Sequence, residues 1–251
     1  MSGEDSGVDR VALVTGANTG IGLAVARRLG NEGYALGFHT KDEDAESKAS
    51  FEEVAGANGV WVPADLVDPA APARIVDDVV AALGRLDVLV NNAGISLAKP
   101  ALELTAEDFD EVFAVDVKAA FLLSVAAAEP MRRVGKGAIV NVTSVHEHVP
   151  RPGLALYSAA KAALGMLTRS LAVELAPEIR VNAVAPGAIA TERNVEAESL
   201  SDEIPLGRPG TPEEVAAVVS FLAGDESGYV SGASFVVDGA LVQQVVSHPA
   251  G

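Results

Sequence analysis

Ser144, Tyr157 and Lys161 carry side chains that together can bind an oxygen and move a proton. Tyr157 and Lys161 are four residues apart in a predicted helix, so their bases lie about 5–6 Å apart on one helix face. An ammonium so close lowers the pKa of a phenol from its usual value of about 10, which suits acid–base chemistry near neutral pH. Ser144 follows a predicted strand. The alternative is a structural helix, because the Tyr-x-x-x-Lys pattern alone is common.

A glycine-rich turn near the N-terminus predicts a second site, for a dinucleotide. Residues 11–14 are four apolar residues typical of a buried parallel strand, and three glycines follow them. Gly16 permits backbone angles that a side chain forbids, Gly20 permits a ligand to approach, and Gly22 permits tight packing of helix on strand. The unpaired N–H groups at the start of the next helix suit a pyrophosphate. The alternative is a tight turn that binds no ligand.

The elements that position these residues alternate along the chain. Strands are predicted at 11–14, 34–39, 60–62, 86–90, 138–142, 180–184 and 234–238, and helices at 23–29, 42–55, 69–83, 105–131, 157–175 and 212–222. This alternation is typical of a parallel sheet with right-handed crossovers. We therefore predict a single doubly wound α/β domain over residues 10–251, preceded by a loose tail at 1–9. Residues 188–210 are predicted to form a mobile substrate flap.

The carboxyl ends of the predicted strands carry polar or small residues. In an open parallel sheet, ligands bind beyond these ends. Six strands contribute, with Gly16, Thr40-Lys41, Asp65, Asn92-Ala93-Gly94, Ser144 and Pro186-Gly187. Agreement across six strands supports a ligand site at this edge more strongly than any single motif.

Composition excludes several classes of protein. The 251 residues are 49% apolar and 21% charged, as expected for a soluble globular chain. No run approaches about 18 apolar residues, and the first nine residues lack the features of a signal peptide. The absence of cysteine excludes disulfides and thiolate catalysis and fits a cytoplasmic protein. A net charge of −17 disfavours nucleic acid and anionic membranes as partners.

From about residue 10 to residue 239 the chain resembles the short-chain dehydrogenase/reductase family. The matching segments are Thr-Gly-Ala-Asn-Thr-Gly-Ile-Gly at 15–22, Asn-Asn-Ala-Gly at 91–94, Ser144, Tyr-Ser-Ala-Ala-Lys at 157–161 and Pro-Gly-Ala-Ile-Ala-Thr at 186–191. The resemblance implies a seven-stranded Rossmann sheet of order 3-2-1-4-5-6-7 and a homotetramer. It also implies hydride transfer between a nicotinamide cofactor and a small alcohol or carbonyl substrate. Tyr157 would pass the proton, Lys161 would hold the nicotinamide ribose, and Ser144 would bind the substrate oxygen.

The resemblance also implies a set of cofactor-binding residues. Asp65 would meet the adenine, and Ile189 and Thr191 would meet the carboxamide. The full set is Gly16, Asn18, Thr19, Gly20, Ile21, Gly22, Thr40, Lys41, Asp65, Leu66, Asn92, Ala93, Gly94, Tyr157, Lys161, Pro186, Gly187, Ile189 and Thr191. No metal site is predicted, because His146 has no second ligand at a suitable spacing.

Two positions depart from the pattern of the family. The family usually has asparagine at the position of Asp116, where it supports a proton-relay water. Aspartate keeps a carbonyl and a similar size, but its carboxylate changes the electrostatics near Lys161, and we predict a catalytic role for it. The alternative is a helix residue that pairs elsewhere. Gly239-Ala240 replaces a common pair of glycines, with little effect expected on the chemistry.

Cofactor choice depends on the end of the second strand. An acidic residue there binds the adenosine ribose 2′-hydroxyl and excludes a 2′-phosphate. This chain has His39-Thr40-Lys41 instead, a donor and a cation. We predict a preference for NADP(H), with NAD(H) as a second cofactor. The alternative is that Lys41 pairs with Asp42 or Glu43.

The substrate is predicted from the loop after Ser144. The segment Ser-Val-His-Glu at 144–147, followed by Pro150 and Pro152, is similar to the glucose 1-dehydrogenase branch. His146 and Glu147, with Ser96, are predicted to line the substrate mouth and to suit a polar substrate such as a sugar. The alternative is that the loop side chains pair among themselves.

Two rival functions follow from the same features. The first is a 3-oxoacyl-thioester reductase, which would be expected to carry a basic patch for its acidic carrier protein. The net charge of −17 weighs against it. The second is a nucleotide-sensing regulator without turnover, a class that usually lacks the tyrosine or the lysine.

Overall fold

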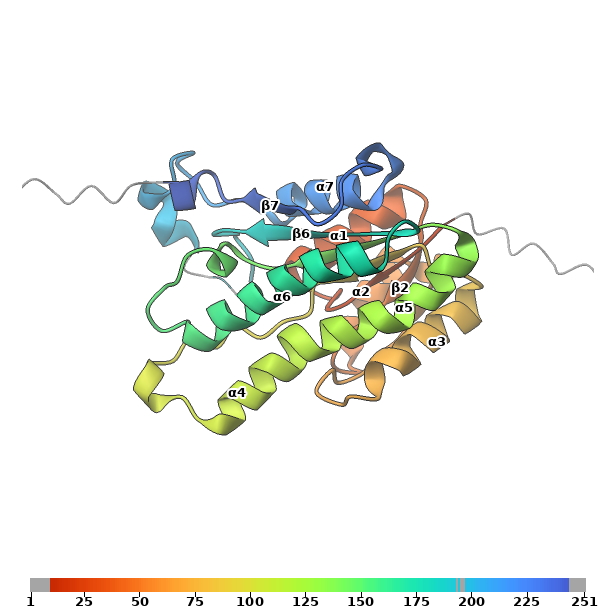
Figure 1. The fold of residues 1–251 in the computed structure, drawn as a ribbon, viewed down its shortest axis with the longest axis horizontal. Helices are drawn as coiled ribbons and strands as arrows, with labels where there is room; N and C mark the ends of the chain where they lie inside the picture. Colours follow the sequence, from red (N-terminus) through yellow and green to blue (C-terminus); the bar gives the residue numbers. More distant parts are fainter. Residues whose placement is uncertain (1–9, 193, 195–196, 244–251) are drawn as a thin grey trace, which may run out of the picture.

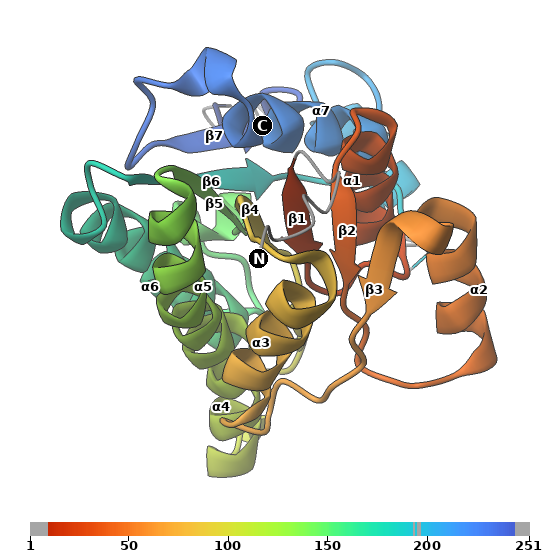
Figure 2. The ribbon, with the colours of Figure 1, turned by 90° about the vertical axis from the view of Figure 1, so that its right-hand side faces the viewer.

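Seven parallel strands form one sheet in the order β3-β2-β1-β4-β5-β6-β7 (Figures 1 and 2). The computed structural model describes residues 10–192, 194 and 197–243, so the predicted tail at 1–9 and part of the predicted flap lie outside the described residues. The strands are β1 (Val11–Val14), β2 (Ala35–Phe38), β3 (Gly59–Trp61), β4 (Val88–Asn91), β5 (Gly137–Val142), β6 (Ile179–Pro186) and β7 (Ser234–Val237). The predicted sheet and its order are confirmed.

The central strands are apolar because helices cover both faces of the sheet. Every residue of β1, β2 and β4 is buried. The helices are α1 (Gly20–Asn31), α2 (Ala45–Val54), α3 (Ala71–Leu83), α4 (Ala106–Phe113), α5 (Ala120–Val134), α6 (Ala155–Glu174) and α7 (Pro212–Ala223). One core cluster packs α1 and α7 on the sheet, and the other packs α3, α5 and the end of α6 on its opposite face (Figure 2).

The helix predicted over 105–131 is interrupted. A capping box between Thr105 and Asp108 starts α4, as the residue types predict. A π-helix then occupies Ala114–Ala119 before α5 begins, although the three segments follow one another as a single rod in Figure 1. The wider turn brings Asp116 into the protein interior, where it is 1% exposed. Such π-helical turns occur frequently at functional sites.

The predicted flap at 188–210 has a closed base and a short helix. The backbone N–H of Ala190 donates to the Gly210 carbonyl at 2.9 Å, and the N–H of Gly210 donates to the Ala188 carbonyl at 2.9 Å. A 3-10 helix, Ala197–Glu203, lies between these ends. The sequence pattern did not predict this helix, because a short 3-10 turn leaves no apolar periodicity.

Candidate active site

The glycine-rich turn between β1 and α1 is held by the neighbouring end of β4. Thr15 Oγ1 accepts hydrogen bonds from the backbone N–H groups of Asn92 and Ala93, both at 3.0 Å. The Asn92 side chain donates to the carbonyl oxygens of Thr15 (2.9 Å) and Gly16 (3.1 Å). A Cβ at Gly22 would lie 2.0 Å from the Gly16 carbonyl oxygen, so only glycine fits there. Thr15 was not among the predicted site residues, although a hydroxyl between a buried strand and the first glycine signals this role.

The start of α1 fits a pyrophosphate. Among the described residues, no side chain caps this helix at Thr19, and its first turn carries no acidic residue. Its N–H groups therefore remain available to an anion. Thr191 lies across the turn, with its methyl group 3.3 Å from the position of a Cβ on Gly20. A cavity of about 400 Å³ lies here, lined by α1, by Ala190, Thr191, Glu192, Asn194 and Glu198, and by the first residues of α7.

The end of β2 buries two side chains and exposes one. His39 and Thr40 are 1% and 0% exposed, and the polar atoms of both side chains bond within the protein. Thr40 Oγ1 donates to the Asp42 carbonyl and accepts from Trp61 Nε1, both at 2.9 Å. Lys41 is exposed, and its Nζ lies 3.7 Å from Asp65 Oδ2 rather than beside Asp42 or Glu43. Of the three residues at this strand end, only Lys41 presents its side chain at the surface.

Three more of the predicted cofactor residues, Asp65, Leu66 and Asn18, lie on the neighbouring loops and make contacts within the protein. Asp65 Oδ1 accepts the N–H of Val67 at 3.0 Å, and Leu66 is buried. Asn18 Nδ2 donates to Ser47 Oγ at 3.0 Å, which joins the glycine-rich turn to the first turn of α2.

Lys161 and Asp116 form a buried ion pair. Lys161 Nζ lies 3.0 Å from Asp116 Oδ2, and the two side chains are 4% and 0% exposed. The ammonium also donates to the Val142 carbonyl at 3.3 Å, and Asp116 Oδ1 accepts the N–H of Ile95 at 2.7 Å. Burial by itself lowers the pKa of Lys161, but Asp116, and then Tyr157, outweigh it and raise that pKa above its usual value. The lysine is therefore held charged.

Tyr157 lies close to this pair, and Ser144 follows two residues after Val142, whose carbonyl accepts from Lys161. The Tyr157 ring centroid lies 5.5 Å from Lys161 Nζ. Ser144 follows β5 and caps the 3-10 helix Val145–Glu147, with its Oγ accepting the N–H of His146 at 3.2 Å. A Cβ at Gly94 would lie 3.1 Å from Lys161 Nζ and 3.2 Å from Asp116 Oδ2, so a side chain there would crowd the ion pair. The predicted catalytic residues are drawn from β5, α6 and the π-helix.

The three predicted substrate residues, His146, Glu147 and Ser96, point to different places. The His146 ring lies edge-on to the Tyr157 ring, with centroids 6.1 Å apart, and its Nδ1 donates to the Val149 carbonyl at 2.9 Å. Glu147 turns away: its side chain is 4% exposed and bonds Ser234 Oγ at 2.7 Å and His148 Nε2 at 2.8 Å. A glycine at 165 leaves room for this carboxylate against α6. Ser96 is exposed.

The end of β6 completes the strand edge. Pro186 is its last residue, and the N–H of Gly187 donates to the Val237 carbonyl at 2.9 Å. A Cβ at Gly187 would lie 2.6 Å from Asp238 Cβ, so a side chain at position 187 would clash with Asp238. Ile189 follows at 3% exposure. In the part of the chain that the structure describes, no helix suits a membrane span, and no three His, Asp or Glu side chains gather as a metal site.

Comparison with known proteins agrees with this geometry. Residues 16–241 match the family model described as enoyl-(acyl carrier protein) reductase. The uncharacterised oxidoreductase YohF of Escherichia coli is 40% identical, covering 93% of this chain and 96% of that protein. The chain belongs to the short-chain dehydrogenase/reductase family. The predicted family is confirmed, and so is the enzyme class: this member is an NAD(P)-dependent oxidoreductase.

Other members of the family support the predicted branch. Glucose 1-dehydrogenase 2 of Bacillus subtilis is 36% identical, covering 92% of this chain and 94% of that protein. The crystal structure of acetoin dehydrogenase from Enterobacter cloacae superimposes with a TM-score of 0.89 at 40% identity, covering 96% of this chain and 99% of that one.

Proposed function

We propose that the protein interconverts small secondary alcohols and ketones that carry a neighbouring hydroxyl group, with a preference for NADP(H). The observation that carries the proposal is the buried Lys161–Asp116 pair close to the Tyr157 ring, with Ser144 two residues after the Val142 carbonyl that accepts from Lys161. When bound, the nicotinamide supplies or accepts the hydride. The glycine-rich turn, the start of α1 and Thr191 would hold its dinucleotide. Lys161 would hold the nicotinamide ribose, and Ile189 and Thr191 its carboxamide.

Each polar group beside the substrate has a defined task. The Tyr157 phenol gives a proton to the substrate oxygen during reduction and takes it back during oxidation. Ser144 Oγ already accepts the N–H of His146, so its own hydrogen is left to donate to the same oxygen. Lys161 keeps a fixed positive charge near the phenol, and Asp116 fixes the position of Lys161. These groups favour a transition state in which charge develops on the substrate oxygen.

The substrate class follows from His146. Its Nδ1 carries the hydrogen donated to Val149, which leaves Nε2 as an acceptor beside Tyr157. A hydroxyl on the carbon next to the reacting one suits this acceptor. The relatives named for acetoin and glucose both act on molecules with adjacent oxygens. We propose no substrate contact for Glu147, because its carboxylate is buried against α6.

Lys41 carries the proposed cofactor preference. Its ammonium is exposed at the end of β2 and has only the exposed Asp65 as an ion-pair partner within the described residues. Such a pair contributes at most about 1 kcal/mol, so a 2′-phosphate competes with it readily. Lys41→Ala is expected to lower kcat/KM for NADP about tenfold and to leave kcat/KM for NAD within about twofold.

We also propose a homotetramer. The exposed apolar side chains Phe109, Phe121, Val125 and Met166 lie on α4, α5 and α6. Sedimentation at micromolar concentration distinguishes a tetramer from a monomer, and a monomer under these conditions contradicts this part of the proposal.

The proposal is tested by absorbance at the reduced-nicotinamide band. Acetoin, 2,3-butanediol, glucose and cyclohexanol are each assayed with NADP and with NAD. We expect turnover of acetoin or the diol with NADP, and a loss of about 10²- to 10⁴-fold in kcat for Tyr157→Phe. Turnover of cyclohexanol alone would remove the neighbouring hydroxyl from the proposal. Cofactor binding without any turnover would favour the regulator.

A further inference from the structure

His39 bridges two segments that the sequence separates widely. Its ring is buried, with Nδ1 3.2 Å from the N–H of Gly16 and Nε2 3.0 Å from the carbonyl oxygen of Ala64. The Gly16 N–H only donates and the Ala64 carbonyl only accepts, so these two partners fix the neutral tautomer with its hydrogen on Nε2. Every polar atom of the ring is therefore used.

The two partners lie on opposite sides of the end of β2. Gly16 opens the glycine-rich turn after β1, and Ala64 precedes Asp65 and Leu66 after β3. The His39 backbone joins the same turn, because its N–H donates to Val14 at 3.0 Å and its carbonyl accepts from Ala17 at 2.9 Å. The strand order β3-β2-β1 makes β2 the element between both segments. His39, which lies between the two segments, thus sets the distance between the glycine-rich turn and the loop after β3.

We propose that His39 is a positioning residue for the adenosine half of the cofactor, which fixes the distance between the glycine-rich turn and the loop at 64–66. The residue touches no reacting atom. Removal of the imidazole leaves both the buried N–H of Gly16 and the buried carbonyl of Ala64 without this hydrogen-bond partner. The two backbone groups then rotate toward water or toward the ligand. Cofactor affinity is therefore more sensitive to His39 than the chemical step is.

The inference rests on the proposed placement of the cofactor along the carboxyl edge of the sheet. The two are separable, because binding to the unaltered protein tests the placement alone. Trp61 supplies the signal: it is the single tryptophan of the chain, and its Nε1 bonds Thr40 beside His39. If neither NADPH nor adenosine 2′,5′-bisphosphate binds the unaltered protein, as measured by Trp61 fluorescence and by calorimetry, the placement fails before His39 is tested.

The decisive comparison uses two His39 variants and one control. His39→Phe keeps a ring of similar size and removes both bonds, whereas His39→Asn keeps an acceptor near the position of Nδ1. Ser227→Ala is the control, because this buried hydroxyl bonds the carbonyls of Leu222 and Gly224, both at 3.0 Å, at the opposite edge of the sheet. It lowers stability without approaching the cofactor.

We expect His39→Phe to raise the Kd for adenosine 2′,5′-bisphosphate, and the KM for NADP, about tenfold, with kcat at saturation within about twofold. His39→Asn is expected to recover part of the affinity, and Ser227→Ala to leave it unchanged. If His39→Phe lowers the melting temperature as Ser227→Ala does but leaves the Kd unchanged, His39 is structural only and the proposal fails. An equal loss in kcat and kcat/KM would also overturn it, because that pattern belongs to a group acting in the chemical step.

Discussion

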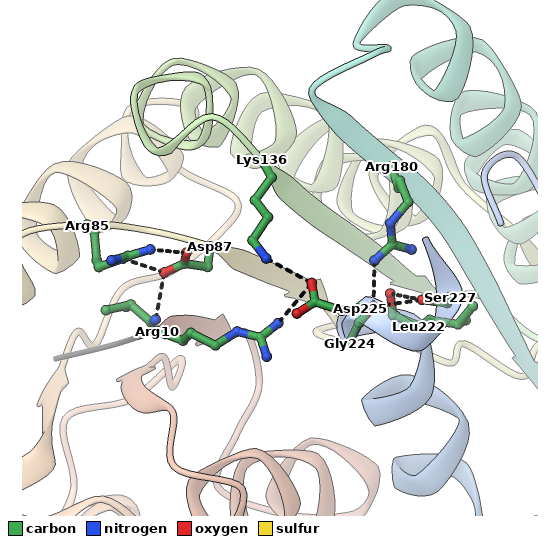
Figure 3. Close-up of polar contacts among 10 residues, drawn as sticks. Arg10, Arg85, Asp87, Lys136, Arg180, Leu222, Gly224, Asp225 and Ser227 are labelled. Atoms are coloured by element: carbon green, nitrogen blue, oxygen red, sulfur yellow. Dashed lines mark hydrogen bonds and ion pairs between the residues drawn. The ribbon is translucent and has the colours of Figure 1, made fainter. Parts of the chain in front are cut away.

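Two charged clusters lie at opposite edges of one parallel sheet and differ in their exposure to water. At the carboxyl edge, Lys161 and Asp116 are 3.0 Å apart and almost fully buried. At the amino edge, Lys136 and Asp225 are 2.9 Å apart, with 63% and 70% of their side chains exposed. Figure 3 shows Arg10 and Lys136 converging on Asp225, while Arg180 donates to the Gly224 carbonyl at 3.0 Å.

The comparison shows that the distance between the charges does not by itself determine how much each ion pair contributes to stability. An exposed pair exchanges one hydrated state for another and contributes about 0–1 kcal/mol. A buried pair has lost its water, so breaking it leaves an uncompensated charge and costs about 3–5 kcal/mol. The amino-edge cluster ties strand ends together. The carboxyl-edge pair fixes a charge where the proposed chemistry occurs.

The largest expected effect comes from matched lysine substitutions at the two edges. Lys161→Met is expected to lower the free energy of unfolding by about 3–5 kcal/mol, because Asp116 remains buried without its ion-pair partner. Lys136→Met is expected to lower it by about 1 kcal/mol or less. Urea unfolding of both variants at pH 7 makes the measurement. Equal losses at the two edges would refute the distinction between them.

A second prediction concerns pH and the buried His39 at the carboxyl edge. Burial lowers the pKa of His39 from about 6.5 to about 4 in the folded protein, despite opposing contributions from the Ala64 carbonyl and Asp65. The unfolded chain therefore binds this proton more readily, so stability falls as pH drops from about 6.5 and levels off below about 4. The difference amounts to about 3 kcal/mol.

This pH dependence is isolated by comparing the protein with His39→Phe. Thermal unfolding between pH 8 and pH 4.5 should show a smaller loss for the variant, since its side chain does not titrate. Carboxylates contribute equally to both proteins. Parallel curves over this range would mean that His39 is as accessible to protons in the folded chain as in the unfolded one.

A third prediction sharpens the role of the carboxyl-edge pair. Asp116→Asn keeps the side-chain shape and the acceptor for the Ile95 N–H, but it removes the largest influence that raises the pKa of Lys161. Burial then acts on the ammonium without this counter-charge, so the pKa of Lys161 falls. The midpoint of the alkaline limb of the activity–pH profile, where the lysine loses its proton, is then expected to move down by about one pH unit.

The pH profile separates positioning from simple structural support. A variant that only loosened the fold would lose activity at every pH without moving the midpoint. Asp110→Asn, a substitution in the exposed part of α4, serves as the control and should leave the midpoint in place. An upward movement of the midpoint in Asp116→Asn would reverse the electrostatic argument.

The smallest effect is expected from the amino edge. The Lys136 ammonium, and then Arg10, hold the pKa of Asp225 below its usual value. Asp225→Asn should lower the free energy of unfolding by about 1 kcal/mol or less in low salt, and by less in 1 M salt, because exposed charges are screened. A loss that persists unchanged in 1 M salt would indicate a buried rather than an exposed cluster.

Local patterns predicted most of the fold and the elements on which several candidate site residues lie. The apolar run at 11–14 and the glycines after it predicted β1 and the turn that Thr15 and Asn92 hold in place. The spacing of Tyr157 and Lys161 predicted their shared face on α6. Boundaries shifted by a few residues, as for α2, which starts at Ala45 after the Asp44 cap rather than at Asp42. In each case the signal lies within one turn or one strand.

The sequence by itself determined the order of the elements and the polar or small residues at the strand ends, because periodicity and turn chemistry are local properties of the chain. Only the tertiary structure decided where several side chains point. His39 turns inward toward Gly16 and Ala64, Glu147 turns toward Ser234, and the π-helix brings Asp116 to Lys161. Their partners come from other strands and helices. Such contacts form only when the sheet assembles and removes each group from water. No local sequence pattern predicts them.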